Sequence, residues 1–328
     1  MRAVLITQTD PTPSVAVVDF DESLLVGDTL IAVEHSTINF KDAMVTMQGN
    51  RVARQSPLIG GVDLAGTILE CPDPRFPVGS SVIVHGHQLG VARHGGFAER
   101  ARVDTEWVIA VPPSMSTRSA MIAGTAGFTA MASMMKIMNA GIQPGDGPIL
   151  VTGATGGVGS ASVLLLAQAG YEVVASSGKR DESEYLESLG AERVIGRDEI
   201  DNNPERTLGS ERWAAAIDCV GGPTLTAILR SLRYGGVVAA SGLTAGSTLE
   251  TTVFPFIVRA VSLLGIDAVE INTTERQAIW NELGSRLSKD DLERILDEEI
   301  TLDDVPQKLE ALRNGFMRGR VLITPDNS

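Results

Sequence analysis

Short apolar or alternating segments rich in Val, Ile and Thr dominate the first third of the chain. They cover residues 2–7, 29–36 and 61–70, and turns rich in Pro and Gly separate them. Such runs between turn residues predict β-strands, whereas residues 39–48 predict one short helix. We therefore expect a β-rich, barrel-like unit with short helices up to about residue 118.

Beyond that point helical and strand patterns alternate. Residues 116–139 predict a long helix with apolar positions on most sides, and Asp181 and Glu184 suggest a capping box for a helix over 181–189. The full series of expected elements is strand 149–152, helix 158–169, strand 172–176, helix 181–189, strand 192–196, strand 214–220, helix 223–233 and strand 235–242. This rhythm predicts a doubly wound parallel sheet.

From residue 261 we expect the chain to leave this sheet. Thr274 and Gln277 suggest the capped start of a helix that runs to about Leu287, and a second helix is expected over 305–313. The final strand, residues 319–324, has no expected partner nearby in sequence. We therefore expect it to return to the N-terminal unit.

The strongest chemical signal is a Gly-rich turn at residues 153–159, between the strand 149–152 and the next helix. Glycine suits a tight turn where backbone must approach a diphosphate, and the helix N-terminus then offers unpaired amides to it. A simple strand-to-helix turn is the alternative. The position inside a βαβ unit favours a dinucleotide site.

The residues after the next strand bear on the choice of dinucleotide. Sites that prefer NAD tend to carry an acidic residue there, but this chain has Ser177, Gly178, Lys179 and Arg180, with Arg197 after the following strand. Lys and Arg can neutralise a 2′-phosphate, which favours NADPH over NADH. A solvated Lys-Arg pair is the alternative.

A compact polar group, Asn39, Lys41 and Asp42, follows the strand 29–36. It is a candidate for catalysis, but a helix cap with an exposed ion pair explains it equally well.

No metal site is expected. His85 and His87 could point to one face of a strand, but no third ligand is evident beside them. We expect these two residues, with His35 and His94, to line a pocket or to make hydrogen bonds in the core. Cys71 and Cys219 are far apart in sequence and predict no disulfide, which fits a reducing, cytoplasmic location.

Composition narrows the class of partner. The 328 residues are 43% hydrophobic, include 34 Gly and carry a formal net charge of −14. This mix predicts a globular α/β protein and disfavours nonspecific binding to nucleic acid or to anionic membranes. The apolar stretch 120–138 contains several Gly, Ser and Thr residues and one Lys, and we expect it to be a buried helix. The N-terminus has no pattern of a secretory signal.

Several segments, taken in order, resemble one known family. They are residues 39–43, 61–66, 124–130, 151–159 and 253–259, with Gly319-Arg320 near the end. Together they resemble the zinc-free, quinone-oxidoreductase-like branch of the medium-chain dehydrogenases/reductases, and within it the NADPH-dependent acrylyl-CoA reductases. Zinc-dependent relatives carry Gly-His-Glu where this chain has Gly61-Val62-Asp63, together with an early Cys ligand and a Cys-rich lobe that this chain lacks.

The resemblance implies an architecture. A chaperonin-10-like catalytic domain would comprise residues 1–122 and 268–328, and a Rossmann domain that binds NADPH would comprise residues 123–267. It also implies a homodimer formed through the edge of the Rossmann sheet.

The resemblance further implies a set of cofactor contacts. Thr155, Gly156, Gly157 and Val158 would hold the diphosphate, and Ser177, Gly178, Lys179 and Arg197 the 2′-phosphate. Leu243, Ile257 and Ala268 would flank the nicotinamide half, and Arg320 would reach in from the C-terminal segment. Phe40 stands at a cofactor-contacting position that is usually Tyr in the family. A hydroxyl there is therefore not essential, or the activity of this protein differs.

The resulting hypothesis is conjugate reduction of an α,β-unsaturated acyl-CoA, with acrylyl-CoA as the concrete substrate. Asn39, Lys41 and Asp42 would order the substrate end of the site, and Arg51, Arg54 and Arg93 are cations available to the phosphates of CoA. Two alternatives stay open, namely a quinone or enone reductase and a noncatalytic NADPH-binding sensor.

Overall fold

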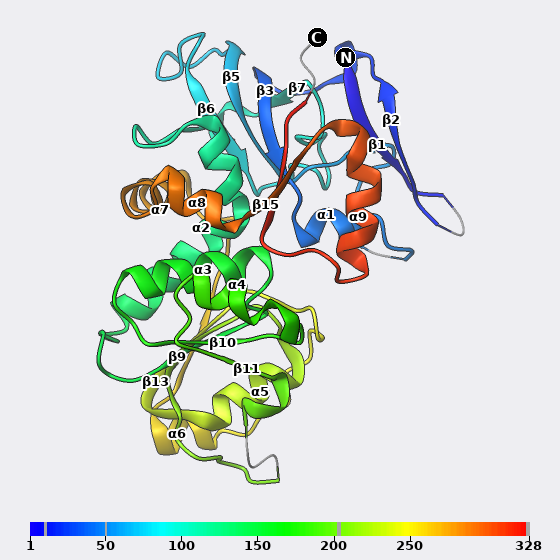
Figure 1. The fold of residues 1–328 in the computed structure, drawn as a ribbon. Helices are drawn as coiled ribbons and strands as arrows, with labels where there is room; N and C mark the ends of the chain where they lie inside the picture. The colour runs from blue at the N-terminus through cyan, green and yellow to red at the C-terminus, as the bar shows by residue number, and fades with distance from the viewer. Residues whose placement is uncertain (10–11, 50, 202–204, 326–328) are drawn as a thin grey trace. The chain divides into compact units, whose positions relative to one another are not determined.

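The computed structural model describes residues 1–9, 12–49, 51–201 and 205–325, and it separates into two compact units. Unit 1 comprises Met1–Thr125 and Ala268–Ser328, and unit 2 comprises Ala126–Asp267. In Figure 1 unit 1 therefore carries both the blue and the red ends of the chain, and unit 2 is mainly green and yellow. The sequence placed the first boundary at residue 122.

Unit 1 contains two sheets in its described part. The smaller one is antiparallel, in the order β2-β1-β4, and the larger one has the order β15-β16-β3-β5-β6-β8, with β7 paired to β3. The strands are β1 (Arg2–Thr7), β2 (Ser14–Asp19), β3 (Thr29–Thr37), β4 (Leu58–Ile59), β5 (Asp63–Glu70), β6 (Ser81–His85), β7 (Arg100–Val103), β8 (Ile109–Ala110), β15 (Leu296–Ile300) and β16 (Arg320–Ile323). The expected strands at 2–7, 29–36 and 61–70 are confirmed.

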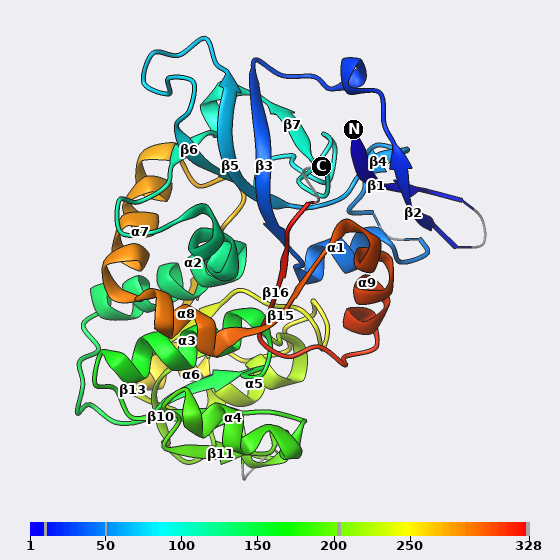
Figure 2. The same ribbon diagram turned by 45° about the horizontal axis from the view of Figure 1, so that its top comes forward.

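The final strand does return to the N-terminal part of the chain. β16 pairs antiparallel with β3, with Leu322 opposite Thr37, and Figure 2 shows the two strands side by side. The expectation that β16 lacks a partner nearby in sequence is wrong, because β15 pairs with it in parallel. β15 reads Leu-Asp-Glu-Glu-Ile, and this charged edge strand carries no hydrophobic signal.

Unit 1 also carries short helices around these sheets. They are α1 (Phe40–Val45), α7 (Thr273–Arg286), α8 (Lys289–Ile295), α9 (Val305–Arg313) and the 3₁₀ turns Glu22–Leu24, Thr105–Trp107 and Leu302–Asp304. α9 lies where the sequence predicted a helix, whereas no helix was predicted at the position of α8. The predicted cap of α7 is wrong, because the side chain of Asn272 accepts the Glu275 amide at 2.9 Å.

The parallel sheet of unit 2 is confirmed. As far as the chain is described, its order is β11-β10-β9-β12-β13-β14. The strands are β9 (Ile149–Thr152), β10 (Val173–Ser176), β11 (Arg193–Ile195), β12 (Trp213–Asp218), β13 (Leu232–Ala240) and β14 (Ser262–Gly265). The chain does not leave the sheet at residue 261 as expected, because β14 adds an edge strand. The strand order reverses between β9 and β12, where α/β proteins of this kind bind their ligands.

The helices of unit 2 are α3 (Gly157–Gln168), α4 (Ser183–Ser188), α5 (Gly222–Ser231) and α6 (Phe254–Arg259), with 3₁₀ turns at Arg180–Glu182 and Arg197–Glu199. α3 is apolar on all sides, and its residues from Gly159 to Leu166 are buried. The predicted capping box of α4 is wrong, since the cap is Glu182 and it makes no side-chain hydrogen bond. α6 was not predicted, and Pro255 stands in its first turn, where proline is tolerated.

The long helix α2 (Thr117–Asn139) contains a break. Gly124 has φ 54° and ψ −161°, which is not helical. α2 is the one helix in the described chain that is long and apolar enough to cross a membrane, but 72% of its most apolar window is buried. This burial supports the predicted core helix.

Candidate cofactor site and a buried polar cluster

The Gly-rich turn of unit 2 is shaped for close backbone packing. Gly153 follows β9 with φ 58°, and Gly156 is the N-cap of α3. A Cβ on Gly159 would lie 2.3 Å from the carbonyl oxygen of Gly153, so only glycine fits there. The turn therefore brings the start of α3 against the end of β9 with no side chain between them.

The start of α3 offers hydrogen-bond donors. The first intrahelical bond runs from Ser160 N to Gly156 O at 2.8 Å, so the amides of Gly157, Val158 and Gly159 have no acceptor within the helix. These amides and the positive end of the helix dipole suit an anion. The turn thus fits the diphosphate of a dinucleotide.

The structure brings together the residues predicted to hold a 2′-phosphate. The hydroxyl of Ser177 accepts the Lys179 amide at 3.0 Å and lies 3.5 Å from the Thr155 hydroxyl. A Cβ on Gly178 would lie 2.9 Å from the guanidinium carbon of Arg197, so this cation covers Gly178. Two hydroxyls and two basic residues gather next to the Gly-rich turn, as a phosphate requires. The side chain of Arg180 lies outside the described part.

Asp218, which the sequence did not single out, occupies the point where the strand order reverses. Its carboxylate accepts the Thr152 hydroxyl at 2.6 Å and the Gly221 amide at 2.8 Å, and burial raises its pKa. It thereby ties the end of β9 to the turn after β12. The sequence signal was a charged residue ending an otherwise apolar strand.

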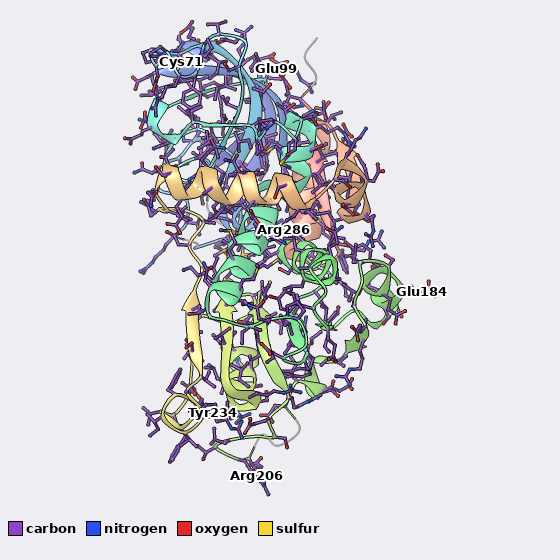
Figure 3. The ribbon with its side chains drawn as sticks, turned by 90° about the vertical axis from the view of Figure 1, so that its left-hand side faces the viewer. Cys71, Glu99, Glu184, Arg206, Tyr234 and Arg286 are labelled. Atoms are coloured by element: carbon purple, nitrogen blue, oxygen red, sulfur yellow. The ribbon has the colours of Figure 1, made fainter. Side chains whose placement is uncertain are left out.

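Leu243 and Ile257 lie at opposite ends of the unit 2 sheet. Leu243 follows β13 and its Cα is 3.2 Å from the Cβ position of Gly221, at the end that carries the Gly-rich turn. Ile257 sits on α6, and Arg259 of that helix donates to Leu232 O at the amino end of β13. Figure 3 labels Tyr234 at this same amino end. We therefore withdraw Ile257 from the set expected around the nicotinamide.

Unit 1 contains a buried polar cluster built from α1, β5 and β16. Asn39 Nδ2 donates to Asp63 Oδ2 at 2.9 Å, and the same oxygen accepts the Thr125 amide at 2.9 Å. Asp42 accepts the Val62 amide at 3.0 Å and the Asn39 amide at 2.8 Å. Asp42 is 1% exposed, so the expected exposed ion pair is wrong, although its part in a helix cap is confirmed.

Arg320 completes this cluster. It is 3% exposed and donates to Thr37 Oγ1 at 2.7 Å, to Ile122 O at 3.0 Å and to Ile38 O at 3.3 Å. At least three of its donors therefore serve unit 1 itself. Lys41 is half-buried on α1, and Phe40 beside it is 37% exposed.

The cluster holds two carboxyl groups and one guanidinium. Burial, followed by the charge of Asp63, raises the pKa of Asp42 to about 7. Burial also raises the pKa of Asp63, although Arg320 opposes this rise. The cluster therefore retains a carboxyl proton close to neutral pH.

The histidines serve the fold of unit 1. β6 ends at His85, and Gly86 and His87 follow with φ 74° and 50°, so the expectation that both histidines point to one strand face is wrong. His85 accepts the Trp280 indole N–H at 2.9 Å, and the His87 ring stacks on Trp107. Within the described ranges, no three His, Cys, Asp or Glu side chains are grouped to hold a metal.

Two further expected residues have defined surroundings. The carbonyl oxygen of Ala268 accepts from the buried guanidinium of Arg276 at 3.3 Å, which ties the start of the second segment of unit 1 to α7. Arg93, expected to be available to CoA, forms an ion pair with Asp104 and lies over the Trp107 ring.

The chain matches the models of two described protein families. Residues 26–113 match the alcohol dehydrogenase GroES-like domain, and residues 157–283 match the zinc-binding dehydrogenase domain. The acrylyl-CoA reductase AcuI of Ruegeria pomeroyi is 42% identical over 300 residues, which cover 92% of this chain and 91% of the relative. The chain is a medium-chain dehydrogenase/reductase of the quinone-oxidoreductase-like type.

Other members of this family support the assignment. A Bacillus subtilis protein named as a quinone oxidoreductase, YhfP, is 43% identical over 302 residues, or 92% of each chain. Its crystal structure was solved with NAD bound and has a TM-score of 0.95 at 98% coverage of both chains. The yhdH oxidoreductase of Salmonella enterica, solved in complex with NADP, has a TM-score of 0.95 and 43% identity over 99% of each chain.

Proposed function

We propose that this medium-chain dehydrogenase/reductase reduces the carbon–carbon double bond of an α,β-unsaturated acyl-CoA with NADPH, and that acrylyl-CoA is its substrate. The observation that carries the proposal is the 42% identity, over nearly the whole chain, to a protein named as an acrylyl-CoA reductase. The phosphate-binding features of unit 2 agree with it.

Each cofactor group has fitting residues in unit 2. Thr155, Gly156, Gly157 and Val158 would line the diphosphate, with the amides of Gly157 and Val158 at the start of α3 as donors. Ser177, Gly178, Lys179 and Arg197 would hold the 2′-phosphate, a group that NAD lacks. Leu243, at the same end of the sheet, remains proposed for the nicotinamide half. Ala268, Phe40 and Arg320 of unit 1 remain proposed cofactor contacts.

The chemistry divides between the cofactor and the chain. Bound NADPH would supply a hydride for the β-carbon of the thioester. Negative charge then develops on the thioester oxygen and requires a hydrogen-bond donor or a cation. Lys41 is the cation of α1 that we propose for this oxygen, and the α-carbon would take its proton from water. Asp42 holds α1 in place, because both of its oxygens already accept backbone amides.

The test is oxidation of NADPH by the purified protein with acrylyl-CoA, and formation of propionyl-CoA. Turnover of acrylyl-CoA well above that of quinones and free enones is expected. Turnover of quinones or enones alone would support a carbonyl-acceptor reductase. The name of YhfP, a quinone oxidoreductase, motivates this alternative. Tight NADPH binding without turnover of any acceptor would support a sensor.

We also propose that the protein is a cytoplasmic homodimer. The edge strand β14, the helix α6 and its N-cap residue expose apolar side chains, among them Ile257 at 72%, Val253 at 63% and Val258 at 51%. Exposed apolar groups beside an unpaired strand edge are typical of a surface that pairs with another chain. A second copy, with its own β14 against this one, fits this surface.

A further inference from the structure

We propose that Asp63 is a positioning residue that fixes the side-chain amide of Asn39 with its oxygen toward the ligand, so that Asn39 acts there as a hydrogen-bond acceptor. This inference rests on the proposed function, because it assigns a role to Asn39 at the substrate end of the site. It also removes Asn39 as a donor to the developing thioester anion.

The orientation of the Asn39 amide follows from its neighbours. Asp63 Oδ2 lies at 2.9 Å and the carbonyl oxygen of Thr37 at 3.2 Å from Asn39 Nδ2. Both neighbours are acceptors, so only the NH2 group can face them, and both of its hydrogens are used. A flipped amide would place an oxygen against a buried carboxylate, which is strongly unfavourable.

The remaining atom, Asn39 Oδ1, is available to a ligand. Asn39 is 8% exposed and its side chain makes no cap hydrogen bond to α1. Among the residues that the structure describes, the polar atoms that are both buried and without a partner do not include Asn39 Oδ1, so this oxygen is not sealed off from a ligand. It therefore offers an acceptor to an N–H or O–H group of the bound cofactor, substrate or water.

The carboxylate of Asp63 is itself held in position by its neighbours, so that it can orient Asn39. Its Oδ2 accepts the Thr125 amide directly after the break in α2, and Arg320 lies close enough to lower the Asp63 pKa in part. A Cβ on Gly124 would lie 2.9 Å from Asp63 Oδ2 and 2.6 Å from Arg320 Nη2, so the backbone of Gly124 packs closely against both side chains. Asp63 can thus hold Asn39 in one orientation.

The test exchanges the two polar groups. Asn39→Asp alone removes both donors and sets two carboxylates against each other, and we expect kcat/KM with acrylyl-CoA to fall about 100-fold or more, near the upper end of single-contact losses. In the double variant Asn39→Asp with Asp63→Asn, the new amide at position 63 can donate to the new carboxylate at position 39, but it then loses the Thr125 amide, which Asp63 Oδ2 accepts in the wild type. Position 39 still presents an acceptor, and we expect kcat/KM to recover at least about tenfold relative to Asn39→Asp alone without reaching that of the wild type.

Asp63→Asn alone keeps an oxygen for Asn39 and Thr125 and should retain most activity, whereas Asp63→Ala should lose it. Asn281→Asp, at an exposed position of α7, is the matched control. A double variant that is no more active than Asn39→Asp, although folded, would overturn the acceptor role. The NADPH dissociation constant and the urea unfolding of each variant are measured beside turnover.

Two readouts separate this inference from the proposed function. If the wild type does not turn over acrylyl-CoA, the proposed function fails, while recovery of unfolding free energy in the double variant still tests the Asn39–Asp63 pair. If the variants do not fold, the wild-type protein labelled with ¹⁵N asparagine decides. Slow exchange of the Asn39 NH2 protons with solvent is expected, and exchange as fast as that of an exposed asparagine would overturn the proposal.

Discussion

At the residue scale, single positions decide whether a cofactor can approach the chain. Gly159 is needed for space, since any side chain would meet the backbone of Gly153. The sequence predicts such a close contact from the spacing of the glycines in residues 153–159. Arg197, by contrast, lies 19 positions after Gly178 in the sequence, and the parallel pairing of β10 with β11 brings the two residues together.

Gly159→Ala should disrupt the turn. The added Cβ would lie 2.3 Å from Gly153 O, and overpacking of this kind costs about 1–3 kcal/mol of stability. NADPH affinity should fall because the start of α3 must shift. Gly265→Ala is the control, since nothing lies within 4 Å of its Cβ position. Urea unfolding and NADPH titration measure both effects, and equal behaviour of the two variants would contradict the packing argument.

Asp42 should make stability depend on pH. Its pKa is raised from 3.8 to about 7, so the folded protein keeps a proton that the unfolded chain releases in this window. The free energy of unfolding therefore falls as pH rises from about 4 to about 7, by at most about 1.4 kcal/mol per pH unit for one proton. Asp42→Asn should make this slope shallower.

Urea unfolding at a series of pH values measures that slope. Asp28→Asn, at an exposed position before β3, is the control and should leave the slope unchanged. An identical slope in the wild type and in Asp42→Asn would show that Asp42 does not carry the proton.

At the scale of elements, hydrophobic period and turn residues predicted most of what the structure contains. The βα alternation of unit 2 and the strands of unit 1 were visible because apolar runs are bounded by Gly and Pro. β15 and α8 were missed because their charged sequences bury only one side or one end. The Asp42–Asp63 cluster was missed as a group because β5 lies beside α1 only in the folded chain.

The break in α2 should be intolerant of a side chain. Gly124→Ala would place a Cβ 2.6 Å from both Arg320 and Thr37, in addition to the strain of φ 54°. Gly141→Ala, after the end of the same helix, shares a positive φ of 93° but meets nothing within 4 Å. We expect Gly124→Ala to be less stable than Gly141→Ala by about 1–3 kcal/mol in urea unfolding. Similar losses would show that backbone strain alone acts at Gly124.

At the scale of the whole molecule, the resemblance to a family implied more about the bound ligand than the amino-acid composition could. The charge of −14 disfavours polyanionic partners, yet unit 2 gathers Lys179 and Arg197 at one small site. Global charge therefore says little about a phosphate site. The sequence alone also cannot show that Ile257 lies at the end of the sheet opposite the Gly-rich turn, because that depends on where α6 lies along β13.

The exposed apolar edge of unit 2 predicts the oligomeric state. Ile257→Glu should convert a dimer into a monomer, since a buried charge at an interface is unfavourable, while the fold stays intact because Ile257 is 72% exposed. Phe316→Glu, at a position 80% exposed in unit 1, should leave the dimer unchanged. Sedimentation velocity measures this, and a wild-type monomer would refute the dimer.

The proposed function depends on a site in unit 2 that recognises a dinucleotide with a 2′-phosphate. Calorimetric titration of the wild type and of Arg197→Ala with NADPH and with NADH tests this most directly. We expect the wild type to bind NADPH at least about tenfold more tightly than NADH, which corresponds to about 1.4 kcal/mol. We expect Arg197→Ala to lose most of this preference and to bind NADH as the wild type does. Equal affinities in the wild type, or no binding of either dinucleotide, would contradict it.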